Sequence, residues 1–312
     1  MEIPFTMEKN IQKKIIPNLW FNKDAEEAVH FYTTVFNRGK ILSKTHYTEA
    51  GRDVHGMEAG TVLTIEFMIE DTTFSALNGG PTFTFTPAIS FIVSCPSVEE
   101  VNEMWEKLSK GGTTLMPLNS YPFSERYGWI QDKYGLSWQV IYNELKKERG
   151  LMPSLLFTGA QCGKAEEAMT YYTSIFDANS SIGDIARYDA NHSPDKEGTI
   201  MYAEFTLAGQ KFAIMDSAQE HGFTFNEAIS FIVLCETQEE IDYYWEKLST
   251  NPEAEQCGWL KDRYGVSWQI VPTTLGEILM STDRQRVDRV MAALLEMKKL
   301  DIGKLEEEFI KH

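Results

Sequence analysis

Two stretches of this chain are nearly identical: GWIQDKYGLSWQV at residues 128–140 and CGWLKDRYGVSWQI at residues 257–270. Both keep the same glycines, tryptophans, aspartate, tyrosine, serine and glutamine at matching places, and both end on an aliphatic residue. The aspartate precedes a Lys/Arg-Tyr-Gly turn, and YGLSWQVI is typical of a buried strand. A phrase this specific indicates an internal duplication.

Other segments recur in the same order. AEEAVHFYTTVF at residues 25–36 returns as AEEAMTYYTSIF at residues 165–176, with seven of twelve positions identical. AISFIV and WEKLS also return unchanged, and the offset between copies stays between 130 and 140 residues. Insertions between the copies are therefore short and loop-like, and the chain consists of two successive copies of about 130 residues each.

Each copy predicts the same series of elements. An apolar stretch (residues 15–21 and 154–157) predicts a strand, and the AEEA segment behind it predicts an amphipathic helix. GTVLTIEFMI with TTFSALN, matched by GTIMYAEFTL with QKFAIMD, predicts hairpin strands. AISFIVSC predicts a buried strand and SVEEVNEMWEKLSKGG a helix that Ser97 begins, with Glu100 three residues on. Each copy thus contains two modules of strand, helix and further strands, which is an α+β pattern.

The residues after Thr274 belong to neither copy. TDRQRVDRVMAALLEMKKL predicts a helix capped by Thr282 or Asp283, and LDIGKLEEEFI predicts a second short helix. We expect a helical hairpin packed on the second copy; an exposed partner-binding helix is the alternative. The expected domains are residues 1–148, 149–275 and a C-terminal extension over 276–312.

Composition limits the partners. The formal net charge of −17 is spread along the chain and would repel a phosphate backbone or an anionic membrane. No run approaches the roughly eighteen apolar residues of a membrane span, and the first residues lack a signal-peptide pattern, so we expect a cytoplasmic location. Four cysteines without a CxxC pair predict reduced, mostly buried thiols.

These motifs, with the tail MKKLDIGKLEEEF, resemble the PhnB-like branch of the vicinal oxygen chelate (glyoxalase/bleomycin-resistance/dioxygenase) superfamily, whose members are often labelled 3-demethylubiquinone-9 3-methyltransferase-like. The resemblance covers both copies and the tail. It implies tandem glyoxalase-like domains, in which paired βαβββ modules curve mixed, mostly antiparallel sheets into cups around a small-molecule cavity. In the metal-dependent relatives, His and Glu side chains on the strands of the cup hold a divalent metal.

This chain departs from the implied ligand set. A glutamate is kept as Glu66 in TIEFMI and Glu204 in YAEFTL, on the face opposite to its apolar neighbours. The first-strand position, where a histidine is expected, falls on Pro17 and Asn18, or on Pro153 and Ser154. The AISFIV strands offer only Ala88, Ser90, Ala228 and Ser230, and the final carboxylate falls on Gln139 and Gln269. Three of the four positions are therefore unsuited to a metal in both copies, and we expect no cofactor.

The alternative is a divalent metal such as Zn, Ni, Fe or Mn, recruited by Glu66 or Glu204 together with loop histidines. Of the six histidines none recurs in both copies, and His55 and His192 are the two that could cover a pocket.

Candidate pocket residues are those duplicated at matching strand positions. The first copy contributes Glu66, Gln139, Trp129, Phe85 and Asn78, and the second contributes Glu204, Gln269, Trp259, Phe225 and Asp216. A structural Glu/Gln hydrogen bond competes with a binding role for the glutamates, and core packing competes with a pocket wall for the tryptophans. No catalytic residue is identified.

The leading hypothesis is a metal-free protein that binds a small organic molecule in one or both cups, as a monomeric pseudo-dimer or weak homodimer. The alternative is a metal-dependent lyase, isomerase or dioxygenase of the vicinal oxygen chelate type. Methyltransferase activity is disfavoured, because the glycines lie in turn contexts without the Gly-rich turn that opens a nucleotide-binding helix.

Overall fold

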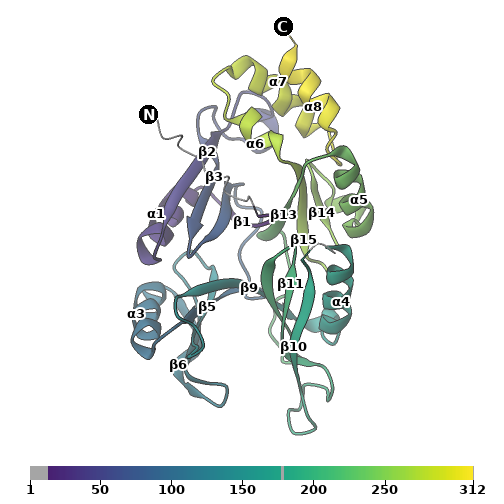
Figure 1. Cartoon of the computed structure of the whole chain (residues 1–312). Coiled ribbons are helices and arrows are strands. Elements are labelled where there is room, and N and C mark those ends of the chain that lie inside the picture. The colour runs from purple at the N-terminus through teal and green to yellow at the C-terminus, as the bar shows by residue number, and fades with distance from the viewer. Residues whose placement is uncertain (1–12, 177–178, 312) are drawn as a thin grey trace, which may run out of the picture.

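The computed structural model describes residues 13–176 and 179–311 and shows two mixed β-sheets of seven and eight strands with helices on their outer sides (Figure 1). This is the predicted α+β class with cupped sheets. Each sheet draws strands from both copies, so neither copy builds a sheet alone.

Sheet A has the strand order β14-β15-β13-β1-β4-β3-β2. The first copy supplies β1 (Ile15–Phe21), β2 (Lys40–His46), β3 (Val62–Ile69) and β4 (Thr72–Asn78). The second copy supplies β13 (Ile229–Cys235), β14 (Trp259–Lys261) and β15 (Ser267–Pro272). The two sets meet where β1 runs antiparallel to β13, with Asn18 opposite Ser230.

Sheet B has the strand order β10-β11-β12-β9-β5-β8-β7-β6. The first copy supplies β5 (Ile89–Cys95), β6 (Thr113–Tyr121), β7 (Ser124–Gln131) and β8 (Ser137–Tyr142). The second copy supplies β9 (Gly150–Phe157), β10 (Ser181–Arg187), β11 (Ile200–Leu207) and β12 (Gln210–Asp216). The junction is the antiparallel pair β5 and β9, with Ser90 opposite Ser154.

This exchange corrects one expectation. Glu66 on β3 and Gln139 on β8 belong to the same copy but to different sheets. Glu66 shares sheet A with Gln269, and Glu204 shares sheet B with Gln139. The Glu/Gln sets are thus formed between copies, because the sheets join at β1–β13 and β5–β9 and each copy is divided between them.

Four helices cover the outer faces (Figure 1). They are α1 (Ala25–Val35), α3 (Val98–Ser109), α4 (Ala165–Ile175) and α5 (Gln238–Leu248). The shorter segments are α2 (Arg52–His55), η1 (Gly159–Gln161) and η2 (Pro252–Ala254). The predicted cap of α3 is confirmed, because Ser97 Oγ accepts a hydrogen bond from the Glu100 N–H at 3.2 Å. Among the described helices, none combines the length and the apolar character that crossing a membrane requires.

The repeated motif of residues 128–140 and 257–270 forms a turn in the core of each copy, and side-chain hydrogen bonds from an aspartate stabilise this turn. Asp132 Oδ1 accepts the N–H groups of Tyr134 and Leu136, and Oδ2 accepts Trp138 Nε1 and the Tyr32 hydroxyl, both at 2.8 Å. Asp262 makes the same four bonds in the second copy. Burial raises the pKa of both aspartates, and the four hydrogen bonds oppose that rise. These aspartates therefore brace structure, and Trp138 is a core residue.

The C-terminal residues form α6 (Thr274–Leu279), α7 (Arg284–Leu295) and α8 (Ile302–Ile310). Asp283 caps α7, and the predicted hairpin of α7 and α8 packs on the second copy through a small apolar cluster that includes Leu300 and reaches Val271. The helices also reach the first copy, since the Ala50 N–H donates to Asp288 Oδ1 at 3.4 Å. They consequently lie across the top of sheet A (Figure 1).

Candidate functional site

A cavity of about 770 Å³ lies between the inner face of sheet A and the C-terminal helices. We call this space cup A and define it by the inward residues Asn18, Glu66, Ser230 and Gln269. Strand alternation explains why these side chains share one face, since the intervening apolar residues such as Phe67 and Phe231 are fully buried in the core behind the sheet. Cup B is the equivalent space at Ser154, Glu204, Ser90 and Gln139 in sheet B.

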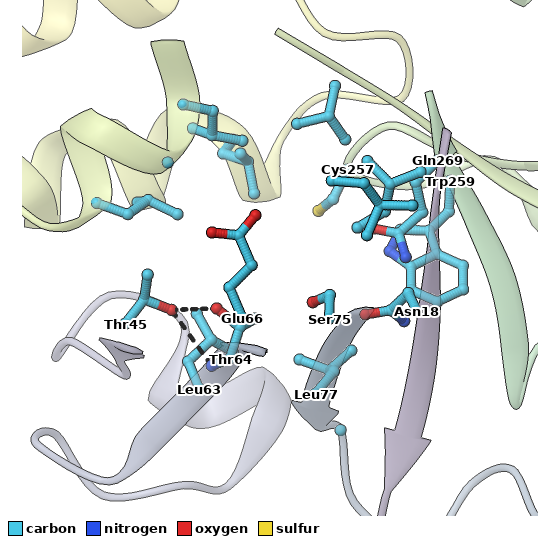
Figure 2. Close-up of a pocket in the computed structure, with 18 of the residues that line it drawn as sticks. Asn18, Thr45, Leu63, Thr64, Glu66, Ser75, Leu77, Cys257, Trp259 and Gln269 are labelled. Atoms are coloured by element: carbon cyan, nitrogen blue, oxygen red, sulfur yellow. Dashed lines mark hydrogen bonds between the residues drawn. The ribbon is translucent and has the colours of Figure 1, made fainter. Parts of the chain in front are cut away.

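Polar groups converge at the centre of cup A. Figure 2 shows the Glu66 carboxylate projecting into the space, with the C-terminal helices on one side and Ser75, Asn18 and Gln269 on the other. Ser43 Oγ donates to Glu66 Oε2 at 3.3 Å. Across the cup, Gln269 Nε2 and Asn18 Nδ2 both donate to Ser230 Oγ, at 2.9 and 3.4 Å. The amide oxygens of these two side chains are left as acceptors.

The walls of cup A are apolar and aromatic. Trp20 packs edge-on against Phe83 and Trp259, with ring centroids 5.0 and 5.9 Å apart. Trp20 Nε1 donates to the Gly80 carbonyl at 2.8 Å, and a Cβ atom at Gly79 would overlap its ring. The glycine therefore lets the indole lie against the strand end and present its ring to the cavity.

One rim of cup A is made by the loop after β2. The Met57 N–H donates to His55 Nδ1 at 3.0 Å, so the ring proton lies on Nε2, which donates to the Ala50 carbonyl at 3.1 Å. The Tyr47 ring packs at a tilt against His55, with ring centroids 4.5 Å apart, and burial raises the pKa of the Tyr47 phenol. On the opposite side, burial raises the pKa of the Cys257 thiol, which also lines the cavity.

The donor set of cup A does not fit the divalent metal that the fold implies. At its centre it offers one carboxylate, Glu66, and two neutral amides that are bonded to Ser230. The Cys257 thiol and three further glutamates also line the cavity, and among the described residues they do not gather with Glu66 into a ligand group. Both ring nitrogens of His55 are engaged by the backbone. Over residues 13–176 and 179–311, no group of three or more His, Cys, Asp or Glu side chains could hold a metal ion. A Zn, Ni, Fe or Mn centre requires more charged or imidazole ligands than these positions present.

Cup B keeps the same strands but fills their inner face with its own side chains. The Tyr127 hydroxyl donates to Gln139 Oε1 at 2.9 Å, and Gln139 Nε2 donates to Ser90 Oγ at 2.7 Å. The Tyr202 hydroxyl donates to Glu204 Oε1 at 3.0 Å, and Lys211 Nζ lies 3.4 Å from Glu204 Oε2. Burial raises the pKa of both tyrosines, which keeps them protonated as donors.

An apolar cluster completes the filling of cup B. Ile92, Met152 and Ala213 are buried together, with Ile141 and Tyr202 packed against them. Ser154 Oγ, a buried atom, has no hydrogen-bond partner within the described chain. Among the described residues, Glu204 and Gln139 do not hydrogen-bond to each other as the structural alternative predicted; each is bonded to a tyrosine instead.

Only three of the candidate pocket residues line the cavity of cup A, namely Glu66, Gln269 and Trp259. Phe85 packs against the core and meets Phe21 edge-on at 5.2 Å, and Phe225 does the same with Phe157 at 5.0 Å. Trp129 Nε1 donates to Ser137 Oγ at 2.7 Å in sheet B.

The other two candidates stabilise helix starts. Asn78 Oδ1 accepts the Ala25 N–H and its Nδ2 donates to the Val62 carbonyl, both at 3.0 Å. Asp216 accepts the N–H groups of Gly163, Ala165 and Ile200. Asn78 also borders a smaller hollow of about 310 Å³ outside cup A. The matching positions therefore serve the start of α1 and of α4, which explains why both copies carry a residue with an acceptor oxygen there.

Several cavity residues were missed from the sequence. Trp20 lies two residues after Asn18 on β1 and lines the cavity. Strand alternation is the sequence signal that would have found it, because residues two apart on a strand share a face. Cys257 and Thr64 stand where the other copy has Tyr127 and Tyr202, a difference visible once the copies are aligned. The contribution of α6 and α7 had no sequence signal, because the packing of a C-terminal segment over a cup is a tertiary property.

Comparison with known proteins agrees with this architecture. The family model described as 3-demethylubiquinone-9 3-methyltransferase matches residues 13–141 and again residues 149–271. A PhnB protein from Bacillus cereus is 41% identical over a match covering 42% of this chain and 100% of that protein, with a TM-score of 0.39. Glyoxalase I from Zea mays is 12% identical, with 83% of this chain and 94% of that chain covered and a TM-score of 0.50, which shows a shared fold alone.

No curated protein matches this chain. The two family matches leave out the short linker and the C-terminal helices, and together they span most of the sequence. The predicted resemblance is thereby confirmed: the chain is a tandem, PhnB-like member of the 3-demethylubiquinone-9 3-methyltransferase family, with the glyoxalase-like fold.

Proposed function

We propose that this protein binds a small organic molecule in cup A, beneath the C-terminal helices. The observation that carries the proposal is the cavity of about 770 Å³, with apolar walls and a few convergent polar groups at its centre. That combination of size and lining is typical of small-molecule sites. One chain supplies both halves of sheet A, so we propose that a monomer is sufficient for binding.

The proposal places binding in cup A rather than in both cups. In cup B the polar centre is already bonded by Tyr127, Tyr202 and Lys211. In cup A the matching positions are Cys257, Thr64 and Thr73, whose side chains are smaller, and the first two line the cavity.

The proposal is for recognition and assigns no reaction. Asn18 and Gln269 each donate a hydrogen bond to Ser230 Oγ, an arrangement that suits the orientation of a polar group on a ligand. The methyltransferase activity named in the family's description is not assigned to this chain, because a shared fold does not by itself establish a shared reaction.

The test is a fluorescence titration with N-phenyl-1-naphthylamine, a neutral probe that brightens in apolar cavities. Wild-type protein should bind it saturably. The double variant T64Y/C257Y copies the two tyrosines of cup B into cup A and should abolish binding, since the rings would occupy the space between Glu66 and Gln269.

The matched control is Y127F/Y202F, which changes the same two positions in sheet B but keeps the rings. It should bind the probe as the wild type does. Equal binding by wild type and T64Y/C257Y, with both proteins folded by circular dichroism, would place the probe elsewhere and refute the proposal.

A further inference from the structure

We propose that the ligand of cup A is an organic cation with an apolar body, whose hydrogen-bond donors take the places that tyrosine and lysine side chains occupy in cup B. This inference rests on the proposed function and specifies the chemical class of the ligand.

Cup B shows what its polar centre requires. Three donors reach it from the protein itself: the hydroxyl of Tyr127 on Gln139 Oε1, the hydroxyl of Tyr202 on Glu204 Oε1, and the Lys211 ammonium near Glu204 Oε2. The glutamate and the glutamine are thus satisfied by two phenolic donors and one positive charge. A half-buried carboxylate is stabilised by such bonds, which are stronger when one partner is charged.

Cup A keeps the acceptors and loses all three donors. Trp259 pairs with Gln269 as Trp129 pairs with Gln139, so Cys257 is the sequence counterpart of Tyr127. Cys257 lies in the turn that leads into β14 rather than on a paired strand, and it lines the cavity without a hydroxyl donor. Thr64 and Thr73 likewise replace the two donors beside the glutamate, Tyr202 and Lys211.

Within the described chain, Glu66 has only the Ser43 hydroxyl as a hydrogen-bond partner, and no Lys, Arg or His nitrogen lies within 4.0 Å of its carboxylate. The amide oxygens of Asn18 and Gln269 point away from the Ser230 bond that their nitrogens make. The carboxylate of Glu66 and the two amide oxygens can therefore accept further hydrogen bonds from a ligand in the cavity.

The charged side chains that line the cavity are all acidic. Besides Glu66 the cavity is bordered by three carboxylates, and among its described lining residues there is no Lys or Arg. Glu227 is already paired with Lys261 at 2.6 Å, which leaves Glu253 and Glu277 toward the rim. A cation is attracted to such a site, whereas a carboxylate or phosphate ligand would be repelled.

The aromatic wall suits the same ligand. Trp20, Phe83 and Trp259 form one edge-to-face cluster along the cavity. Ring faces attract an ammonium group within about 6 Å and also pack against an apolar body. The volume of about 770 Å³ accommodates a molecule larger than a simple amine.

The experiment uses three probes with one carbon skeleton: 1-naphthylmethylamine, 1-naphthylmethanol and 1-naphthoic acid. Each displaces N-phenyl-1-naphthylamine from full-length protein at pH 7. The amine should bind more tightly than the alcohol by about tenfold, as expected for a hydrogen bond to a charged group, and the acid should bind most weakly.

Two variants assign the effect to Glu66. E66Q should remove most of the preference for the amine while leaving the alcohol nearly unchanged. E204Q makes the same substitution in cup B and should leave all three affinities unchanged. Should E66Q fold poorly, E66A provides the test instead, because removal of the carboxylate without added bulk should weaken the amine more than the alcohol.

The outcomes separate the two proposals. Equal affinity for the three probes, or an amine preference that survives in E66Q, overturns the cation inference while the neutral probe still supports binding in cup A. Failure of every probe, the neutral one included, overturns the proposed function itself.

Discussion

Cup A and cup B are built from equivalent strands, and the cavity of about 770 Å³ beneath the C-terminal helices lies in cup A. Both keep a glutamate, a glutamine and a serine at the same inward positions. Cup B places two tyrosines and a lysine over these groups, and cup A places a cysteine and two threonines. The two cups therefore differ in side-chain volume beside the polar groups that they share.

The two sheets also differ at the edge strands beside the glutamines. In sheet B, the long hairpin of β6 and β7 pairs along the outer edge. In the second copy this hairpin is shortened to η2 and β14, and the N–H groups of Cys257 and Gly258 donate instead to Met297 and Lys298, both at 2.8 Å. The C-terminal helices thus take over an edge that the first copy closes by itself, and they gain access to cup A.

The largest effect is expected when the tyrosines of cup B are replaced by the small residues of cup A. The variant Y127C/Y202T should gain binding of N-phenyl-1-naphthylamine at a second site. It should also lose about 5 kcal/mol of unfolding free energy, because the buried Tyr127 ring and the partly buried Tyr202 ring are removed and the surrounding residues relax only in part. Urea denaturation and the stoichiometry of probe binding measure the two effects.

The ring-preserving variant Y127F/Y202F separates volume from hydrogen bonding. It should cost only about 1 kcal/mol per lost hydroxyl, and its stoichiometry should stay at one. A second binding site in this variant would mean that hydrogen bonds, and not bulk, keep cup B closed.

A smaller effect is expected from loosening the cover of cup A. Leu300 is fully buried between α7, α8 and the β14 edge. L300A should lower the free energy of unfolding by about 3 kcal/mol. It should also weaken probe binding, because Leu300 packs in one cluster with Leu275 and Leu294, which line the cavity. Hydrogen exchange at Cys257 and Gly258 should accelerate as their bonds to residues 297 and 298 open more often.

Leu145 offers the matched control, because its side chain is 87% exposed. L145A should change neither stability nor binding measurably. If L300A destabilises the protein but leaves probe affinity intact, the C-terminal helices stabilise the second copy without covering the site.

The smallest effect concerns the thiol that replaces Tyr127. Burial raises the pKa of Cys257, so less of it is thiolate at a given pH than in a free cysteine. Alkylation by iodoacetamide, followed by mass spectrometry, should be slower than for a free cysteine at pH 8, and its rate should keep rising above pH 9. Bound N-phenyl-1-naphthylamine should slow it further. A rate equal to that of free cysteine at pH 8 would contradict the burial of this thiol in the cavity wall.

Much of the fold was predictable because the internal duplication can be recognised in the sequence. Strand β1, the β3–β4 hairpin, helix α3 with its Ser97 cap and the Asp283 cap of α7 all follow local patterns of alternation, helical spacing and capping. The exchange of half-sheets was not predictable, because a strand such as β1 carries no mark of which distant strand it will meet. The edge strands β2 and β10 were also missed, since their mixed, largely exposed residues lack a buried face.

The candidate site was predictable in part. Glu66 and Gln269 were recognised from their duplicated, inward-facing positions, yet Gln139 was expected beside Glu66 and lies in the other sheet. Asn78 and Asp216 carry polar atoms at strand ends, a pattern shared by ligand sites and helix caps, and here they bond to backbone groups. Which cup is open depends on side-chain volume at Thr64 and Cys257, which becomes informative only when the two copies are compared in space.

The exchange of half-sheets also sets an order of assembly during synthesis. In cup B, Ser90 and Ser154 pair across the junction of the two copies and are 64 positions apart, and every strand of sheet B precedes Ser217. In cup A, Asn18 and Ser230 are 212 positions apart, and β15 ends only at Pro272. Because distant pairings form late, strand β1 must wait with an unpaired edge while ribosomes complete the second copy. Cup B can therefore form first on the nascent chain, and cup A forms last.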